Sequence, residues 1–370
     1  MSGKRAYDPV LLEQWAARVL IHEGLSTADS DAVAHSLVEA DLRGVRSHGL
    51  MGGQGLAEIR RGIQKGHIKR QPKPKRNLAG RGKYACVIII DGDHQVGHAG
   101  ARDAARLCQS LAGTYGIGKV YLHNTTHFGM AGLYSEQMAA GGDVMARVTC
   151  TSPPWSVPFV HGNEVGKGVK AIGSNPIAWS TPYPDGVVTI DMATTQRAAS
   201  VALRAGRENG RQLGQGMGSV ARIPRDYLLG PSGEEVVEPR DEQFVRQCSI
   251  LPLGGREFGY KGFGLALSIA FDGVLGDPRQ DSSDETGNGD QLVQVFEAWA
   301  LDLCHPVKTA IERIGSVASQ VLARGGKGTL MPGQIERQRA EYSLLHGIEY
   351  DRIEWEGLSD IGKSCGLPLD

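Results

Sequence analysis

Several short segments of the sequence place a reactive polar residue beside glycine, where an expected helix or strand ends. Ser47 and His48 occur in "RSHG", His127 in "HFGMAG", Asp191 in "DMATT" and Lys261 in "FGYKGFG". Binding and catalytic residues tend to lie at such junctions, and glycine lets the backbone approach a flat ligand. The adjacent serine and histidine at 47 and 48 suit a proton donor at the edge of a cleft.

Each of these residues also has a purely structural interpretation. Asp191 can cap the helix that follows it, His127 can be a hydrogen-bonded loop histidine, Lys261 can be a surface cation and Ser47 can stabilise a local turn. One such junction would not indicate a site. Five in one chain, including the rigid turn "GSNPIAWSTP" at 173–182, favour one.

The usual nucleotide-binding motifs do not account for these residues. The dinucleotide fingerprint Gly-x-Gly-x-x-Gly is absent, and the nearest approach, "GQGMGS" at 214–219, fails at Ser219. The segment "GLSDIGKS" at 357–364 satisfies the P-loop pattern, but only six residues follow it, which leaves no room for the helix that must bind the phosphate. A nicotinamide cofactor would therefore bind outside the usual doubly wound arrangement.

Two His-x-x-x-His pairs, His94/His98 and His123/His127, have the spacing at which a helix presents two metal ligands. Glycines interrupt the first pair, and the second crosses from an expected strand into a loop. Neither has an obvious carboxylate to complete the ligand set, so no metal site is predicted.

The composition is that of a globular protein, with 41% hydrophobic and 22% charged residues. Forty basic and 41 acidic residues give a net charge of -1, which provides no electrostatic basis for binding nucleic acid or a membrane. The six cysteines form no Cys-x-x-Cys pair. The N-terminus lacks an apolar signal segment, and the longest apolar run, 262–276, is too short to span a bilayer, so we expect a cytoplasmic protein.

Hydrophobic periodicity predicts the elements that position the polar junctions. Helices are expected at 9–23, 26–44, 54–65, 101–116, 133–142, 196–206, 291–324 and 331–347. Strands are expected at 84–93, 118–124 and 144–152, with a strand-like segment at 348–355, and 208–240 is expected to be a loop. Alternating strands and helices predict a mixed α/β core.

Six segments together resemble the second type of the malate/L-lactate dehydrogenase family. They are "DLRGVRSHG", "HFGMAGLYSEQMAAGG", "GSNPIAWSTP", "IDMATT", "GYKGFGLALSIAFDGVLG" and "MPGQIE...GIE", and they cover nearly the whole chain in order. The resemblance implies an oxidoreductase that uses NAD or NADP and acts on a small 2-oxo or 2-hydroxy acid or a cyclic imino acid. It also implies an α/β fold with a non-Rossmann, largely antiparallel cofactor-binding sheet, a helical lobe from both chain ends and an intertwined homodimer.

The same resemblance implies a division of the chain into two regions. The helical lobe, with the dimer contacts and part of the active site, would be residues 1–75 and 291–370. The NAD(P)-binding α/β core would be residues 76–290.

By position, the resemblance assigns roles to individual residues. Ser47, His48 and Asp191 correspond to a proton-relay trio, and His127 to the proton acceptor of alcohol-oxidising members. An imidazole would protonate the oxygen or nitrogen after hydride transfer, and Asp191 would fix its tautomer. The implied cofactor contacts are His127, Phe128, Gly129, Ser152, Asp191, Met192, Ala193, Lys261, Gly333 and Gln334, of which Lys261 would neutralise a phosphate or carboxylate.

One position departs from the family pattern. The family usually reads Ser-His-Gly-x-x-Arg, and that arginine binds the substrate carboxylate, but this chain has Gly52 there. We expect Arg46, or else Arg43, to substitute from another direction, with Thr151 also contacting the substrate. The substrate is therefore an unusual acid or one that binds without the standard carboxylate pose.

Two other functions compete with this interpretation. A non-catalytic relative that binds cofactor or ligand as a sensor would explain the missing arginine. A serine hydrolase using Ser47 lacks the Gly-x-Ser-x-Gly elbow, and a serine adjacent in sequence to its histidine is not the usual spacing.

Overall fold

The structure is a computed structural model that describes residues 3–79, 82–158, 169–214, 221–277 and 292–369. The chain divides into two compact units. Unit 1 comprises Met1–Val148, Ala178–Asp191 and Gln294–Asp370, and unit 2 comprises Thr149–Ile177 and Met192–Val293. These limits differ from the lobe boundaries expected at 75 and 291, and the roles expected for the two lobes stay predictions.

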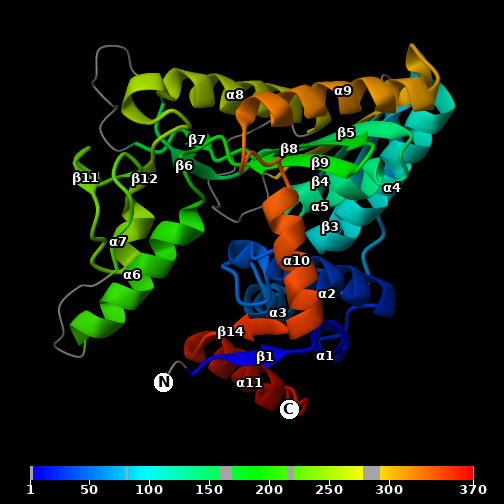
Figure 1. Ribbon diagram of the computed structural model, residues 1–370. Coiled ribbons are helices and arrows are strands. Elements are labelled where there is room, and N and C mark those ends of the chain that lie inside the picture. Colours follow the sequence, from blue (N-terminus) through cyan, green and yellow to red (C-terminus); the bar gives the residue numbers. More distant parts are fainter. Residues whose placement is uncertain (1–2, 80–81, 159–168, 215–220, 278–291, 370) are drawn as a thin grey trace. The chain divides into compact units, whose positions relative to one another are not determined.

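A helical layer of unit 1 draws its hydrophobic core from both chain ends (Figure 1). Its helices are α1 (Pro9–His22), α2 (Thr27–Leu42), α3 (Leu56–Gln64) and α11 (Arg352–Ser364), and α10 (Gln334–His346) contacts α2. Strands β1 (Arg5–Tyr7) and β14 (Ile348–Tyr350) pair antiparallel and tie the two ends together. The fully buried Trp15 also donates its indole N–H to the carbonyl of Leu367.

Side-chain caps explain where these helices begin. The Asp8 carboxylate accepts from the backbone N–H groups of Val10 and Leu11 at the start of α1, and the Ser26 hydroxyl accepts from Asp29 at the start of α2. Asp351 caps α11 in a reciprocal capping box. The expected strand at 348–355 therefore stops at residue 350, and the P-loop-like segment 357–364 lies inside α11.

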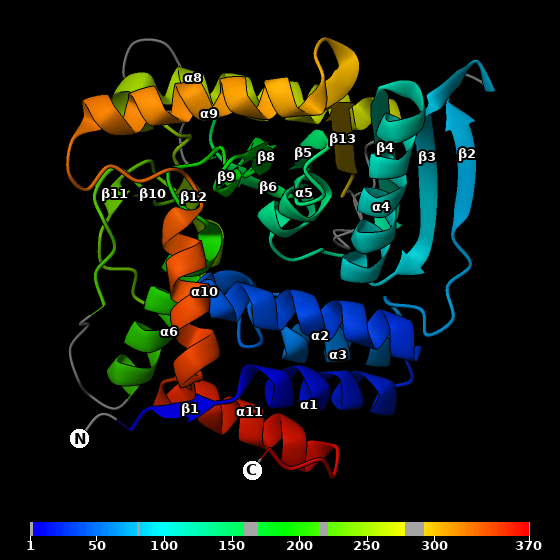
Figure 2. The same ribbon diagram turned by 45° about the vertical axis from the view of Figure 1, so that its right-hand side comes forward.

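A seven-stranded sheet forms the rest of unit 1's framework, in the order β2-β3-β4-β13-β5-β8-β9. The strands are β2 (Lys75–Ala79), β3 (Tyr84–Gln95), β4 (Ile117–Thr125), β13 (Gln294–Ala300), β5 (Val144–Cys150), β8 (Ile177–Tyr183) and β9 (Gly186–Met192). β3 and β4 are parallel, whereas β2 with β3 and β4 with β13 are antiparallel. Helices α4 (Gly97–Tyr115) and α5 (Ala131–Ala139) lie on one face of this sheet (Figure 2).

The helix expected at 291–324 is partly wrong. Residues 294–300 form strand β13, and the helical part is limited to a short turn at Leu301–Leu303 and to α9 (Val307–Gly325). β13 lies between β4 and β5 and is buried along almost its whole length. A strand buried on both faces loses the polar–apolar alternation that identifies a strand in sequence.

Unit 2 has a smaller sheet in the order β11-β10-β12-β6-β7. Its strands are β6 (Pro154–Ser156), β7 (Ile172–Gly173), β10 (Leu228–Leu229), β11 (Glu235–Val236) and β12 (Ser249–Ile250). Its helices are α6 (Ala199–Gly214), α7 (Glu242–Gln247) and α8 (Gly255–Gly276).

The segment 208–240 is not loop throughout. Helix α6 continues to residue 214, and β10 and β11 form within the segment. Apart from Gly214, "GQGMGS" lies outside the described residues. The predicted mixed α/β class is confirmed, and no helix in the described ranges has both the length and the apolar content for a membrane span.

Candidate active site

Two histidines that are far apart in sequence stack against each other in unit 1. His48 ends a short 3-10 turn, Arg46–His48, just after α2, and His127 follows β4. Their ring centroids are 5.5 Å apart with an interplanar angle of 21°. The structure therefore places two of the residues predicted from the sequence, His48 and His127, in contact.

The turn that carries His48 is held by a buried carboxylate. Asp41 accepts hydrogen bonds from the backbone N–H of Leu50 at 2.9 Å, the hydroxyl of Tyr350 at 2.7 Å and Nη1 of Arg46 at 3.2 Å. Burial raises the pKa of Asp41, and the Arg46 guanidinium opposes that rise. Arg46 also donates to the carbonyl of Glu349 and lies over the ring of Tyr350. Its guanidinium is therefore engaged in holding the turn.

Gly52 is packed directly behind the same turn. A Cβ atom at this position would collide with the carbonyl oxygen of Ser47, and 3.1 Å would separate it from the carbonyl oxygen of Arg46. The neighbouring Gly53 has open space in the Cβ direction. The glycine that replaces the family arginine is thus required by this backbone, and an arginine at position 52 would displace Ser47.

The loop that carries His127 is held mainly through its backbone and by the start of α4. The Gly97 N–H donates to Oγ1 of Thr126, and Nε2 of Gln294 donates to the Thr126 carbonyl at 3.0 Å. A Cβ on Gly97 would collide with that carbonyl. The Gly129 N–H donates to Nδ1 of His127 at 3.1 Å, so the imidazole itself is fixed by a main-chain group.

A third histidine, His98, contacts His127 edge-on, with ring centroids 6.5 Å apart. It is 1% exposed, and neither ring nitrogen has a hydrogen-bond partner in the described part of the chain. The sequence suggested only a metal pair with His94. β3 and β4 are parallel, so residues that follow their carboxyl ends meet at one edge of the sheet, which brings His98 to His127.

Burial keeps these imidazoles neutral. It lowers the pKa of His48 to about 4, that of His98 to about 3 and that of His127 well below its usual range. Because Nδ1 of His127 accepts from a backbone N–H, its single proton lies on Nε2. Nδ1 of His48 is 2.8 Å from Oγ of Ser47, and a hydroxyl can either donate or accept in that bond.

Asp191 lies at the end of β9, where its Oδ2 accepts from the Gly132 N–H at 2.8 Å. The residue as a whole is exposed, but protein atoms surround its carboxylate closely. The reduced hydration of the carboxylate raises the pKa of Asp191 to about 6. No hydrogen bond links Asp191 to His48 or His127 within the described residues. The expected trio is therefore joined only at Ser47 and His48.

The remaining candidates in unit 1 lie in the loop that precedes α5 and at the start of α10. Phe128 is buried and stacks on Tyr134, and Gly129 has a φ of 81°. Gly333, with a φ of 83°, packs against Thr189 of β9, and α10 begins there without a side-chain cap. Gln334 accepts from the Met331 N–H.

The other candidates belong to unit 2. Oγ1 of Thr151 accepts from the Val293 N–H at 2.8 Å, and the Ser152 N–H donates to Oδ1 of Asn175 at 3.0 Å. Lys261 is exposed on α8 beside Phe258. Met192 is exposed at the end of β9, and Ala193 follows it. The expected cofactor residues are thus divided between the two units.

The described residues contain no group of three or more His, Cys, Asp or Glu side chains arranged to hold a metal ion. The three neighbouring histidines do not form such a group.

Comparisons with known proteins give the chain a family. The model of the family described as malate/L-lactate dehydrogenase matches residues 8–359. The malate/(S)-sulfolactate dehydrogenase of Methanothermus fervidus is 27% identical over 95% of this chain and 96% of its own length. The ureidoglycolate dehydrogenase (NAD(+)) of Escherichia coli K12 is 29% identical over 71% of this chain and 66% of its own.

A solved structure agrees with these sequence matches. The malate dehydrogenase of Pyrococcus horikoshii OT3 superimposes with a TM-score of 0.79 at 25% identity, covering 99% of this chain and 97% of that one. The chain belongs to the malate/L-lactate dehydrogenase family and is an oxidoreductase of the dehydrogenase type.

Proposed function

We propose that the protein transfers a hydride between NAD(P)H and a small 2-oxo acid or cyclic imino acid, and that the histidines of unit 1 handle the accompanying proton. The stacked, neutral pair His48 and His127 carries the proposal. The names of the relatives support the hydroxy/oxo acid class, and the E. coli relative's name includes NAD(+).

The residues expected to contact a dinucleotide have suitable chemistry. Lys261 is an exposed cation with no acidic partner among the described residues, and it can bind a phosphate. The N-terminus of α10, which follows Gly333, has no side-chain cap, and such a helix terminus can bind a phosphate. Ser152 adds a hydroxyl on a tight polar turn with Asn175. When bound, NAD(P)H supplies the hydride, and the protein residues supply binding, orientation and proton transfer.

His127 is suited to polarise the reacting bond. Its proton lies on Nε2, so the neutral ring can donate a hydrogen bond to the carbonyl oxygen or imine nitrogen. This differs from the acceptor role that the resemblance implies, because an acceptor needs its lone pair on Nε2. A backbone N–H cannot reverse its hydrogen bond, so His127 keeps the donor form.

Ser47 and His48 form the part of the relay that can reverse. In the reduction direction the new C–H bond forms, the π electron pair moves to oxygen or nitrogen, and that atom takes the proton from Nε2 of His48. Nδ1 of His48 takes the Ser47 hydroxyl proton in the same step, and Ser47 regains one from solvent. Oxidation runs the same sequence backwards. We propose that Asp191, near the end of β9, contacts the bound substrate or cofactor directly and makes no hydrogen bond to His48 or His127.

The substrate carboxylate needs a partner other than the expected arginines. Arg46 is engaged by Asp41 and the Glu349 carbonyl, and Arg43 pairs with Glu39 and Glu136. We therefore propose that Arg46 positions His48 through the turn. Thr151 stays a candidate substrate contact.

We also propose a homodimer. Helix α9 exposes Val317 and Val321, and α10 exposes Tyr342, Leu344 and, at 82%, Leu345. Apolar side chains gathered on helices in this way are typical of an interface. Sedimentation of the purified protein tests this, and a monomer at micromolar concentration would contradict it. A cytoplasmic location stays a prediction.

The test of the function mixes the purified protein with NADH or NADPH and a panel of 2-oxo acids and cyclic imino acids, and follows the nicotinamide absorbance. We expect turnover with at least one acid, and loss of turnover with retained NAD(P)H binding in His48→Ala and His127→Ala. Cofactor binding without turnover across the panel would favour the sensor function. The relatives do not favour that function, because they are named as dehydrogenases. Labelling of Ser47 by a fluorophosphonate would instead favour a hydrolase.

A further inference from the structure

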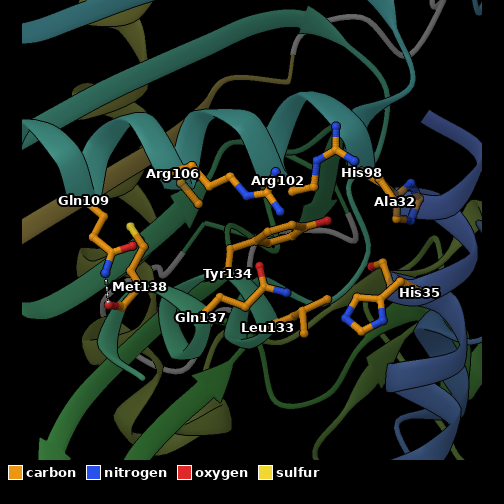
Figure 3. A pocket seen from close by; sticks show the side chains of 12 residues that line it. Ala32, His35, His98, Arg102, Arg106, Gln109, Leu133, Tyr134, Gln137 and Met138 are labelled. Atoms are coloured by element: carbon orange, nitrogen blue, oxygen red, sulfur yellow. Dashed lines mark hydrogen bonds between the residues drawn. The ribbon is translucent and has the colours of Figure 1, made fainter. Parts of the chain in front are cut away.

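A cavity of about 290 Å³ opens between α2, α4 and α5 of unit 1 (Figure 3). Its apolar surface comes from Ala32, Ala105, Leu133, Met138 and the ring of Tyr134. All five are at most 8% exposed, and Tyr134 is fixed by a hydrogen bond to the Phe128 carbonyl. The cavity therefore has a preformed apolar wall of a size that suits a small ligand.

One buried polar side chain in this cavity has no partner. His98 is 1% exposed, and neither of its ring nitrogens makes a hydrogen bond within the described residues, while Ser36, 2% exposed, lies beside it and bonds to Tyr134. Buried polar atoms are nearly always paired, because an unpaired one costs about 1–3 kcal/mol. The cavity thus presents the two ring nitrogens of His98 as hydrogen-bonding atoms that a bound molecule can satisfy.

The rim of the cavity is basic. Arg102 and Arg106 stand one turn apart on α4, and Figure 3 shows Arg106 extending toward the Tyr134 ring. Arg102 also donates to Asp103 and to the Ala28 carbonyl, whereas Arg106 has no ion-pair partner among the described residues. His35 and Gln137 extend the rim.

No acidic side chain lines the cavity among the described residues. Two rim residues have acidic partners outside the lining: Asp103 engages Arg102, and Glu13 engages His35 at 3.4 Å. Arg106 lines an apolar cavity that also contains the unpaired His98, and this combination suits a residue that binds an anion.

We propose that this cavity binds a compact organic anion, with a carboxylate at Arg102 and Arg106, an apolar body against Tyr134 and Leu133, and a polar group that reaches His98 and Ser36. The residues that line the cavity do not include His48 or His127, and the proposal does not depend on the proposed function. His98 is shared, since its ring contacts His127 on one side and lines the cavity on the other.

The experiment measures the binding of benzoate to the cofactor-free protein by calorimetry, with benzyl alcohol as the uncharged probe of similar shape. We expect one benzoate per chain, at least tenfold weaker binding of benzyl alcohol, and about tenfold weaker benzoate binding in Arg106→Gln. Gln137→Glu places a negative charge on an exposed rim residue and should abolish benzoate binding. Arg324→Gln, which removes an exposed arginine from α9, is the matched control and should bind as wild type does.

Three results would overturn the proposal. They are no benzoate binding, equal weakening in Arg106→Gln and Arg324→Gln, and a change of oligomeric state in Arg106→Gln that would assign this arginine to a subunit interface. Because neither cofactor nor turnover enters the measurement, failure here and failure of the proposed hydride transfer are distinguishable.

Discussion

The turn at 46–49 and the loop at 126–129 each present one of the stacked histidines, but different parts of the chain hold them. The turn is held through side chains, with Asp41 bonding to Arg46 and Tyr350, and Ser47 bonding to His48. The loop is held by bonds from Gly97 and Gln294 to Thr126, and the Gly129 backbone N–H fixes the His127 ring. A hydroxyl can reverse its hydrogen bond and a backbone N–H cannot, so the first imidazole can change tautomer while the second is fixed.

Replacing His127 by phenylalanine should give the largest effect. The ring can still stack on His48, but the variant lacks the Nε2–H that we propose polarises the substrate, so we expect turnover to fall about a thousandfold. Stopped-flow or steady-state kinetics on the active substrate measures this, with NADH binding followed by fluorescence. His67→Phe, at an exposed position, is the control. Turnover within threefold of wild type would show that the fixed histidine is not part of the chemistry.

Gly52→Ala tests how closely the turn is packed. The added Cβ collides with the Ser47 carbonyl, so the turn must shift, at a cost of about 1–3 kcal/mol in the free energy of unfolding. Turnover should fall at least tenfold because His48 moves with Ser47. Gly53→Ala is the matched control, since its Cβ meets nothing, and its stability should stay within about 0.5 kcal/mol of wild type. Equal melting curves for the two variants would contradict the packing.

Ser47→Ala removes the reversible partner of His48. One hydrogen bond of ordinary strength corresponds to about a tenfold decrease in turnover, which is well below the effect at His127. Ser110→Ala, at an exposed position on α4, serves as the control. If Ser47→Ala and His127→Phe lose activity equally, the distinction between an adjustable and a fixed histidine is wrong.

Replacing His98, which contacts His127, should give the smallest effect, and that effect should appear in how the free energy of unfolding depends on pH. Its pKa is lowered to about 3 in the folded protein, so below about pH 6.5 the unfolded chain takes up a proton that the folded chain does not. The free energy of unfolding therefore decreases as the pH falls. Asp191, whose pKa is raised to about 6, acts in the opposite direction between about pH 4 and 6 and is present in every variant.

Denaturant unfolding at pH 7.5 and 5.5 measures this effect. Between pH 7.5 and 5.5 the free energy of unfolding should fall by about 1 kcal/mol more in wild type than in His98→Gln. His67→Gln should behave as wild type. The same pH dependence in wild type and His98→Gln would show that His98 is protonated in the folded protein.

The sequence predicted the elements whose signals are local. The expected helix at 9–23 is α1, because Asp8 caps it and its apolar face faces one core, and the expected strand at 84–93 is most of β3. Family resemblance brought Ser47, His48 and His127 forward together. The long-range contacts had no local signal. The bond from Tyr350 to Asp41 joins residues 309 apart in the chain, and it explains why Arg46 is engaged.

Gly52 shows that the sequence alone does not predict how closely the backbone packs around a residue. The sequence marks the missing arginine, and only the packing behind Ser47 shows that this backbone excludes any side chain there. His98 is a similar case. Its spacing suggested a metal pair with His94, whereas the parallel pairing of β3 and β4 places it beside His127.

The late strand β13 has a consequence for biosynthesis. It occupies the middle of the large sheet, and its first residue, Gln294, bonds to Thr125 and Thr126 beside the loop that carries His127. A nascent chain that has emerged from the ribosome only as far as residue 290 therefore has β4 and β5 without the strand that separates them, and an open edge on each. Residue 300 must therefore be synthesised before β13 can complete the sheet and Gln294 can hold the loop of His127, and until then the open edges of β4 and β5 are sites for chaperone binding.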